Sequence, residues 1–278
     1  MKPNVKKVIQ NSISQIPDSE VALCLSSGID SNSLLFELLE QGKKVTAFTF
    51  TMEGVMSTDF IYAKKNCETF DIELVHVELP TDMEKIKKDI YTLARLGARS
   101  KTDFECFFPF LYLYNHPKLS QKYIVSGLGA DGHFCISKKG MMHFKDTRIN
   151  EFRELLFSKP NYAQKNLHED YCKKIGKIHI TPFLTQEMIN EFKGTTWEQI
   201  NKPKEKQSIL DSYKDWFTKI KVFPHTNFQK GNSKISTTFA ELVNTDINKK
   251  KHKTQVGIFN DIVREVVNEK NFNDGKTI

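Results

Sequence analysis

The sequence predicts an α/β fold in which a doubly wound, mostly parallel sheet is followed by a helical C-terminal region. In the first half of the 278-residue chain, short β-rich runs alternate with segments of helical periodicity. Two turns rich in small residues follow two of these runs, and strand-like alternation fades after residue 147. Alternating strands and helices of this length favour right-handed crossovers and a parallel sheet covered on both faces. We therefore expect an α/β core over residues 1–147 and a mainly helical region over residues 148–278.

The first half of the chain supplies the expected strands and most of the long helices. Apolar, β-branched and aromatic residues predict strands over residues 21–25, 44–51, 72–79 and 123–126. Helical patterns lie near residues 31–42, 57–70, 82–96 and 105–116. Ser57 or Thr58 is suited to cap the second of these helices, and Thr81 the third.

The second half of the chain is rich in Lys, Glu, Asn and aromatic residues at helical spacing. Prolines at positions 160, 182, 203 and 224 divide it into short helices. Trp197 and Trp216 are expected to anchor its core. We expect this region to complete the site that the α/β core begins.

Composition limits the class of protein. Hydrophobic content of 39% and charged content of 27% are ordinary for a soluble globular protein. No apolar run approaches the ~20 residues that span a bilayer, and the segment after Met1 has no apolar secretory signal. The five cysteines are scattered without a Cys-x-x-Cys pair, which favours free thiols in a reducing compartment. We expect a cytoplasmic protein with no membrane partner.

The net charge of +7 admits an acidic partner, which is either a nucleotide or a nucleic acid. Much of the excess lies in the run Lys249-Lys250-Lys251-His252-Lys253. No aromatic-interleaved RNA-binding motif accompanies this run, so a solvated surface segment is favoured. Nucleic acid is therefore the less favoured partner.

The most informative segment is the turn Cys24-Leu25-Ser26-Ser27-Gly28-Ile29-Asp30-Ser31, which lies between an apolar run and an amphipathic one. Small residues let main-chain N–H groups approach an anion, and the following helix N-terminus adds partial positive charge. The hydroxyls can donate to phosphate oxygens, and Asp30 can bind a magnesium ion. The turn is therefore predicted to bind the pyrophosphate part of a nucleotide. No Walker-type Gly-x-x-x-x-Gly-Lys-Ser/Thr occurs in the chain.

A second turn, Ser126-Gly127-Leu128-Gly129-Ala130-Asp131-Gly132, follows the strand expected over residues 123–126. It matches the dinucleotide fingerprint Gly-x-Gly-x-x-Gly. That interpretation requires a helix directly afterwards, and the next residues, His133 to Met142, are not helix-periodic. A dinucleotide-dependent oxidoreductase is therefore disfavoured. We expect instead that Asp131 lies across a crevice from Asp30, so that the two carboxylates share one metal ion.

Five segments resemble, in the same order, motifs of the asparagine synthetases and β-lactam synthetases. Residues 25–31 resemble the PP-loop Ser-Gly-Gly-x-Asp-Ser of ATP pyrophosphatases, and residues 126–131 resemble the Ser-Gly-Glu-Gly-Ala/Ser-Asp of those synthetases. Three weaker matches are Thr181-Pro182-Phe183-Leu184, the Lys-rich stretch 202–210, and Phe228-Gln229-Lys230-Gly231. Together the matches span roughly residues 20–240, most of the chain.

The resemblance implies an adenine nucleotide α-hydrolase-like fold and an ATP-dependent amide ligase that forms AMP and pyrophosphate. It implies nucleotide contacts from Ser26, Ser27, Gly28, Asp30, Ser31, Phe50, Ser126, Gly127, Gly129 and Asp131. Asp30 and Asp131 would hold Mg²⁺, and Lys230 and Lys206 would act on the pyrophosphate that leaves. The implied partners are ATP, a small carboxylate, and ammonia or an amine, with a separate glutaminase as one source of nitrogen.

The chain departs from the family pattern at several positions. Met1 is followed by Lys2 and not by a nucleophilic Cys, so we expect no N-terminal glutaminase domain. The family's proton-handling Glu is Leu128 here, which accepts no proton, and the later Glu is Gly132. In the helix that lines the family's substrate pocket, Asp103 and Glu105 suggest a different acceptor, a cationic one.

Two alternatives keep the fold and change the activity. One is a PP-loop enzyme that adenylates and modifies a nucleic-acid base, for which salt-dependent binding of RNA or DNA would be the sign. The other is a catalytically impaired ATP-binding homologue, suggested by Leu128 and Gly132, which would bind ATP without turnover.

Overall fold

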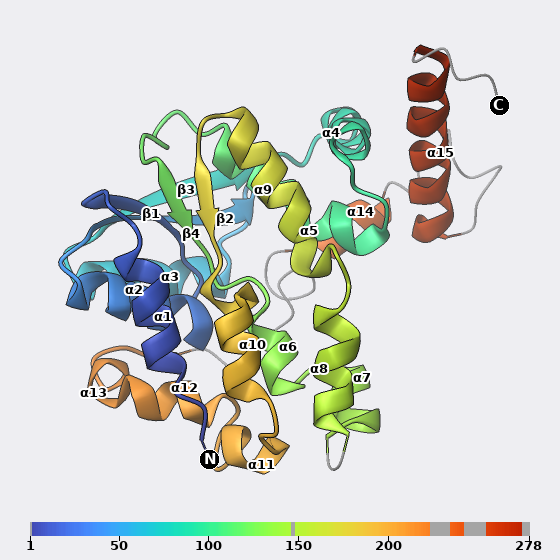
Figure 1. Cartoon of the computed structure of the whole chain (residues 1–278). Coiled ribbons are helices and arrows are strands. Elements are labelled where there is room, and N and C mark those ends of the chain that lie inside the picture. The colour runs from blue at the N-terminus through green and yellow to red at the C-terminus, as the bar shows by residue number, and fades with distance from the viewer. Residues whose placement is uncertain (1, 146–147, 223–233, 242–253, 274–278) are drawn as a thin grey trace. The chain divides into compact units, whose positions relative to one another are not determined.

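A five-stranded parallel sheet forms the centre of the fold within the residues that the structure describes (Figure 1). The computed structural model describes residues 2–145, 148–222, 234–241 and 254–273. The strands are β1 (Glu20–Cys24), β2 (Lys44–Met52), β3 (Glu73–Leu79), β4 (Tyr123–Val125) and β5 (Ile178–Ile180), in the order β3-β2-β1-β4-β5. The expected doubly wound α/β class is confirmed.

Helices flank the sheet and account for most of the remaining described residues. Before β4 they are α1 (Val5–Ser14), α2 (Ile29–Glu40), α3 (Thr58–Thr69), α4 (Met83–Leu96) and α5 (Lys101–Tyr114). After β4 come α6 (Ala130–Phe134), α7 (Lys138–His143), α8 (Ile149–Phe157), the 3₁₀ turn η1 (Tyr162–Gln164) and α9 (Lys165–Lys174). After β5 come η2 (Pro182–Leu184), α10 (Gln186–Phe192), α11 (Trp197–Asn201), α12 (Gln207–Ser212), α13 (Lys214–Phe217), α14 (Ile235–Glu241) and α15 (Gln255–Asn273).

The four expected strands and four expected helices are present, with three differences in detail. Asp82, and not Thr81, caps α4, because its side chain accepts a hydrogen bond from the Lys85 N–H at 2.7 Å. The short helix α6 follows the second glycine-rich turn directly, so the expectation that no helix starts there was wrong. β5 was not predicted, since three residues carry too little periodicity to be recognised.

Contacts divide the chain into two units, each assembled from separate stretches. Unit 1 contains Met1–Thr49, Thr58–Val75 and Ser120–His225, and unit 2 contains Phe50–Ser57, His76–Leu119 and Thr226–Ile278. The boundary expected at residue 147 stays a prediction.

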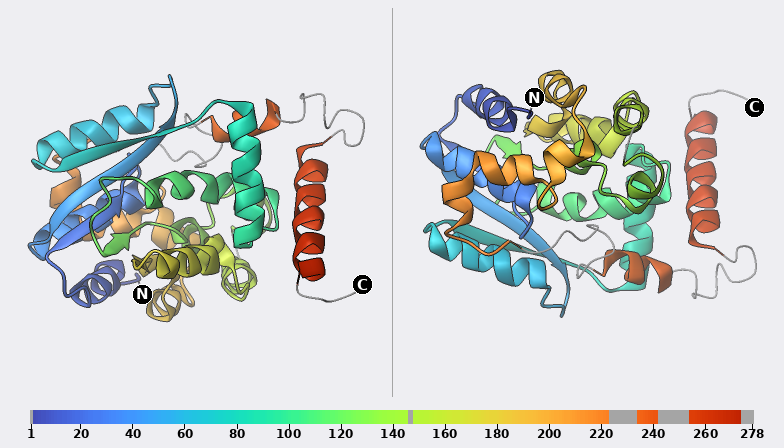
Figure 2. Two further views of the ribbon diagram at one scale, coloured as in Figure 1. Left: turned by 90° about the horizontal axis from the view of Figure 1, so that it is seen from above. Right: turned by 90° about the horizontal axis from the view of Figure 1, so that it is seen from below.

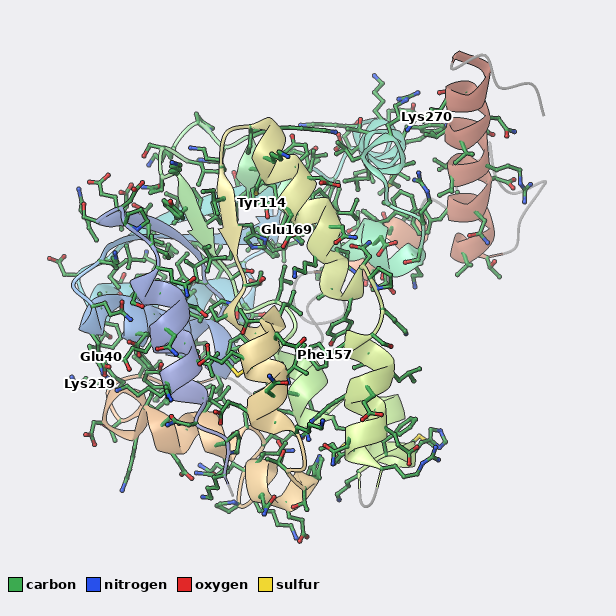
Figure 3. The ribbon with its side chains drawn as sticks, viewed as in Figure 1. Glu40, Tyr114, Phe157, Glu169, Lys219 and Lys270 are labelled. Carbon is green, nitrogen blue, oxygen red and sulfur yellow. The ribbon has the colours of Figure 1, made fainter. Side chains whose placement is uncertain are left out.

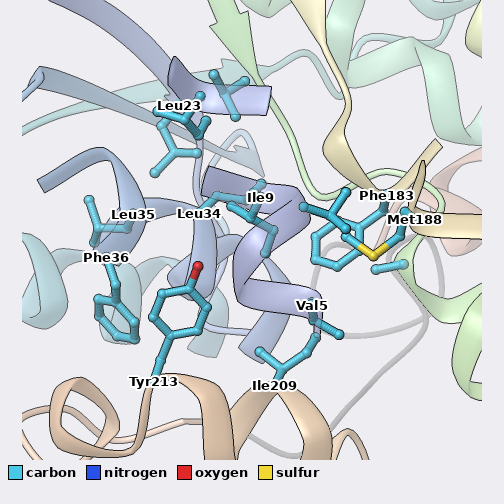
Figure 4. Packing of buried hydrophobic residues seen from close by; sticks show 14 of the residues in the cluster. Val5, Ile9, Leu23, Leu34, Leu35, Phe36, Phe183, Met188, Ile209 and Tyr213 are labelled. Atoms are coloured by element: carbon cyan, nitrogen blue, oxygen red, sulfur yellow. The ribbon is translucent and has the colours of Figure 1, made fainter. Parts of the chain in front are cut away.

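The core of unit 1 joins the N-terminal helix to elements from far along the chain. Val5, Val8, Ile9 and Ile13 lie on one face of α1 and are fully buried. They pack beside α2, α10 and α12, as Figures 1 and 2 show for the helices and Figure 4 for the side chains of Val5 and Ile9. Burying each such side chain contributes about 1.5–3 kcal/mol. Trp197 is buried in the same cluster, and Trp216 packs against it by stacking on Phe36.

Unit 2 is built around α4, α5, α14 and α15. The ring of Phe104 on α5 stacks on Phe259 of α15 at 4.8 Å, and Phe108 packs edge-to-face on Phe239 of α14 at 5.0 Å. Among the described helices of both units, none has the length and apolarity needed to cross a bilayer.

Candidate active site

Three loops of unit 1 begin side by side at one edge of the sheet. The first loop follows β1, the second follows β4 and the third follows β5. Leu23 of β1 pairs with Val125 of β4, and Val125 pairs with Ile180 of β5, so these strands end in register. The Ser126 N–H donates to the Ile180 carbonyl at 3.1 Å, and this bond joins the second loop to β5. Ligands of α/β folds bind at this carboxyl edge of the strands.

The first loop is held in shape by its own hydroxyls. Ser31 Oγ accepts a hydrogen bond from the Ser26 N–H at 3.1 Å and lies 3.0 Å from Ser26 Oγ. Ser26 Oγ also accepts from the Gly28 N–H at 3.2 Å. The hydroxyls predicted to contact pyrophosphate therefore bond within the loop in this structure. No side chain caps α2, which starts at Ile29 directly after Gly28, so the helix N-terminus suits an anion.

The hydroxyl of Ser27 forms a hydrogen bond to another residue of the protein. Its Oγ donates to Asp59 Oδ1 of α3 at 2.5 Å, and the residue is fully buried. Any contact between Ser27 and a phosphate would therefore come from its main-chain N–H. Asp59 was not recognised from the sequence.

The two glycine-rich loops approach each other closely. A Cβ on Gly127 would lie 3.1 Å from the Cβ of Asp30 and 3.5 Å from the Ser31 nitrogen. Gly129, with φ of +87°, has no room for a side chain either, because its Cβ would lie 2.2 Å from Leu184 Cδ2. A side chain at Gly127 would therefore be crowded, the φ of Gly129 favours glycine, and the second loop brings Asp131 toward Asp30.

One ammonium group joins the two predicted metal-binding carboxylates. Lys206 Nζ donates to Asp131 Oδ1 at 2.7 Å and also to Asp30 Oδ2. The Lys206 side chain is 4% exposed, Asp30 is 18% exposed and Asp131 is 48% exposed. The structure thus brings together Asp30, Asp131 and Lys206, which lie far apart in the sequence.

The backbone at Lys206 is fixed in an unusual conformation. Its φ of 60° and ψ of 30° place a non-glycine residue in the left-handed region just before α12. The buried Asn201 accepts a hydrogen bond from the Lys206 N–H at 2.9 Å and donates to the Phe134 carbonyl at 2.9 Å. Left-handed non-glycine residues cluster at functional sites, and this one aims a lysine at two carboxylates.

The charge of Lys206 is stabilised by its two partners. Burial lowers the pKa of its ammonium, but attraction to Asp30 and Asp131 outweighs burial and raises the pKa above its ordinary value. The group is therefore a permanent cation at neutral pH. Its position is where phosphate oxygens and a divalent ion would also gather.

A buried histidine orients the first residue of the second loop. Ser126 Oγ lies 2.8 Å from His179 Nε2 on β5, and the His179 ring packs against His168 of α9 at 4.8 Å. Burial lowers the pKa of His179 to about 3, so its ring is neutral. The Ser126 hydroxyl is therefore tied to the sheet.

A buried arginine stabilises the second and third loops through hydrogen bonds to main-chain carbonyls. Arg153 of α8 donates to the carbonyls of His133, Phe192 and Thr195 at 2.7–3.1 Å. The His133 Nε2 in turn donates to the Phe183 carbonyl at 2.7 Å. Burial lowers the pKa of His133 to about 3 and that of Arg153 to about 10. These bonds connect the end of α6 to η2 and to the end of α10.

Tyr162 fills the space beside Gly132. A Cβ on Gly132 would lie 2.4 Å from the Tyr162 hydroxyl oxygen and 3.2 Å from Phe157 Cζ. Phe157, labelled in Figure 3, also stacks on His133 at 4.3 Å. The position where the family motif has a second Glu is thus occupied by aromatic side chains.

Other predicted residues lie outside this group. Lys230 and the basic run 249–253 fall outside the described residues. Phe50 lies on β2 in unit 2, where its ring packs against Phe110 at 6.3 Å. Asp103 completes a capping box with Ser100 at the start of α5, and Glu105 bonds to Lys101 and Ser236. Both carboxylates have partners within unit 2, and the cationic acceptor stays a prediction.

Asp30 and Asp131 supply only some of the ligands that a magnesium ion needs. Two carboxylates converge on one cation position, and oxygen ligands are the ones that Mg²⁺ prefers. In the described part of the chain, no group of three or more His, Cys, Asp or Glu side chains is arranged to hold a metal. Phosphate and water oxygens would have to supply the remaining ligands, as is usual where Mg²⁺ binds with a nucleotide.

Comparisons with known proteins place this geometry in a family. The family model described as asparagine synthase matches residues 4–251. An NH3-dependent NAD synthetase from Campylobacter jejuni, solved with a nitrate ion, is 16% identical; the match covers 99% of this chain and 94% of that one, with a TM-score of 0.41. An NMN synthetase from Francisella tularensis is also 16% identical, over 81% of this chain and 99% of that one, with a TM-score of 0.31. A search of curated proteins gives no match.

The family match covers both glycine-rich loops and the segment that carries Lys206. The parallel sheet and the convergence of these loops at its carboxyl edge agree with it. The chain belongs to the asparagine synthase family of ATP-using PP-loop enzymes.

Proposed function

We propose that the protein is an AMP- and pyrophosphate-forming ligase that adenylates a small carboxylate for attack by ammonia or an amine. The observation that carries this proposal is the cation position shared by Lys206, Asp30 and Asp131 at the ends of adjacent parallel strands. Family membership adds ATP as the nucleotide. We further propose that the reaction takes place in the cytoplasm, since the five cysteines are free thiols.

In this proposal the loops bind the triphosphate through main-chain groups. The N-terminus of α2 would face the phosphates, because no side chain caps it and the loop hydroxyls bond to one another. Ser126 and Gly127 would lie beside the ribose and α-phosphate. Phe50 and Gly129 stay predicted nucleotide contacts.

Asp30 and Asp131 would hold Mg²⁺ against the phosphates. When bound, the ion withdraws charge from the phosphate oxygens and so stabilises the charge that grows on pyrophosphate as it leaves. Lys206 would then donate to those same oxygens, since its ammonium lies between the two carboxylates. Lys230 is proposed as a second cation for pyrophosphate from its place in the family motif.

The chemistry has two steps. A carboxylate oxygen of the substrate attacks the α-phosphorus, the bond from this phosphorus to the bridging oxygen breaks, and pyrophosphate leaves with the electron pair. The nitrogen of ammonia or an amine then attacks the acyl carbon, AMP leaves, and the nitrogen loses a proton. Leu128 accepts no proton, so in this chain the proton would pass to water or to another group.

Exchange between ATP and radiolabelled pyrophosphate tests the first step without requiring the second. We expect exchange that depends on one carboxylate of a panel and falls about 100-fold in Asp30→Ala and in Lys230→Ala. Lys44→Met, which removes an exposed ion pair with Glu20, should keep the wild-type rate. Exchange without any carboxylate, or none with the entire panel, would contradict the proposal.

A further inference from the structure

Helix α3 contacts the first loop through a part-buried hydrogen bond between a hydroxyl and a carboxylate. Ser27 Oγ donates to Asp59 Oδ1 at 2.5 Å, and Ser27 is fully buried. Asp59 lies in the first turn of α3, so the bond joins the helix start to the middle of the loop. Hydrogen bonds to an ionised carboxylate are roughly twice as strong as those between neutral groups.

A second chain of hydrogen bonds runs from α3 to the same loop. Asn66 Nδ2 donates to Asn32 Oδ1 at 3.1 Å, and both residues are buried. Asn32 Nδ2 donates to the Gly28 carbonyl at 2.7 Å and to the Ser26 carbonyl at 3.4 Å. Asp59 and Asn66 are separated by two helical turns, which places both on one face of α3.

These bonds determine which main-chain groups the loop can offer to a ligand. The carbonyls of Ser26 and Gly28 are turned toward Asn32, and so toward the protein interior. A phosphate-binding loop needs this arrangement, because an outward carbonyl would repel an anion while an outward N–H attracts it. A carboxylate close to a phosphate site is unfavourable by itself, so the position of Asp59 calls for a compensating role.

We propose that Asp59 and Asn66 are positioning residues, which act through Ser27 and Asn32 to fix the loop over residues 26–31 in its anion-binding conformation. Neither residue needs to touch the nucleotide. The proposal rests on the proposed function for the identity of the ligand, ATP, but not for the conformation of the loop.

Amide hydrogen exchange tests the positioning in the nucleotide-free protein. In Asp59→Ala we expect the peptide that contains residues 26–31 to exchange at least about tenfold faster than in the wild type, and in Asn66→Ala likewise. Asp59→Asn keeps an oxygen acceptor for Ser27 and should restore most of the protection. Ala63→Gly is the control, because it weakens the buried middle of α3 without touching the loop.

A double-mutant cycle on ATP affinity tests the functional consequence. Ser27→Ala and Asp59→Ala should each weaken ATP binding about tenfold, and the double variant should be no weaker than either single variant. Ala63→Gly should bind ATP like the wild type. Additive effects in the cycle, or unchanged loop exchange in both alanine variants, would overturn the positioning role. A wild-type protein that binds no ATP would contradict the proposed function, and loop exchange would still decide the role of α3.

Discussion

The Nζ of Lys206 lies 2.7 Å from an Asp131 carboxylate oxygen and also contacts Asp30, so one ammonium bridges both acidic residues of the site. The Lys206 side chain is buried there, whereas Asp30 is 18% exposed and Asp131 is 48% exposed. Under the proposed function Asp30 and Asp131 would hold Mg²⁺, and this relationship leads to the first prediction.

Lys206→Met should lower the free energy of unfolding by about 3 kcal/mol, because it removes a buried ammonium that donates to both carboxylates. Mg²⁺ or Mn²⁺ should recover part of this loss and should bind to the variant more tightly than to the wild type. Urea unfolding with and without Mg²⁺, and Mn²⁺ binding by electron paramagnetic resonance, measure the two effects. Lys202→Met, which removes an exposed pair with Glu198, should change little. Equal Mn²⁺ affinity in wild type and Lys206→Met would contradict the shared position.

Gly129→Ala should destabilise the protein by about 3 kcal/mol. The residue has φ of +87°, which costs an alanine about 1–2 kcal/mol, and the new Cβ would lie 2.2 Å from Leu184 Cδ2. Gly42→Ala separates the two causes, since Gly42 has φ of +67° with no atom within 4 Å of a Cβ. If both variants lose the same stability in urea unfolding, the clash with Leu184 is not significant.

Stability should fall with pH through the range in which unfolded histidines gain protons. Burial lowers the pKa of His133 and of His179 from 6.5 to about 3, so the unfolded chain binds more protons between these values. The contribution is fully present above about pH 6.5 and is lost as the pH falls toward 3. At about pH 5.5 each histidine should cost about 1.4 kcal/mol relative to neutral pH. His179→Asn should reduce the slope of unfolding free energy against pH, and the same change at the exposed His143 controls for the substitution itself.

Arg153→Met should lower the free energy of unfolding by about 4 kcal/mol. The substitution keeps an apolar side chain of similar length but removes the donors to the carbonyls of His133, Phe192 and Thr195. Arg148→Met is the matched control on the same segment, because Arg148 forms an exposed pair with Glu151. Chemical unfolding of both variants measures the difference. Equal losses of unfolding free energy would show that the buried hydrogen bonds of Arg153 contribute no more than the exposed ion pair of Arg148.

The sequence was sufficient for the strands and loops that carry local signals. Glycine and hydroxyl residues after apolar runs predicted both loops, and the register of parallel strands explains why the loops meet. Asp103 was interpreted as a pocket residue, whereas the structure shows that it forms a capping box with Ser100.

Residues joined only by tertiary packing could not be predicted in the same way. Asp59 bonds to Ser27, and Arg153 bonds to three carbonyls. No periodic pattern in the sequence indicates these contacts. Lys206 was expected from the family motif, but its left-handed backbone and its bond to Asn201 depend on the packing of α11 against α12. Propensity describes local segments, whereas these contacts are set by how the segments assemble.

The assembly of unit 1 from three separate stretches has a consequence for the growing chain on the ribosome. The apolar face of α1 packs against α10 and α12, which are synthesised long after it. Until those helices emerge from the exit tunnel, Val8, Ile9 and Ile13 lack the part of their native cover that α10 and α12 supply. We therefore expect nascent chains that stop before α12 to need chaperone protection and to aggregate without it.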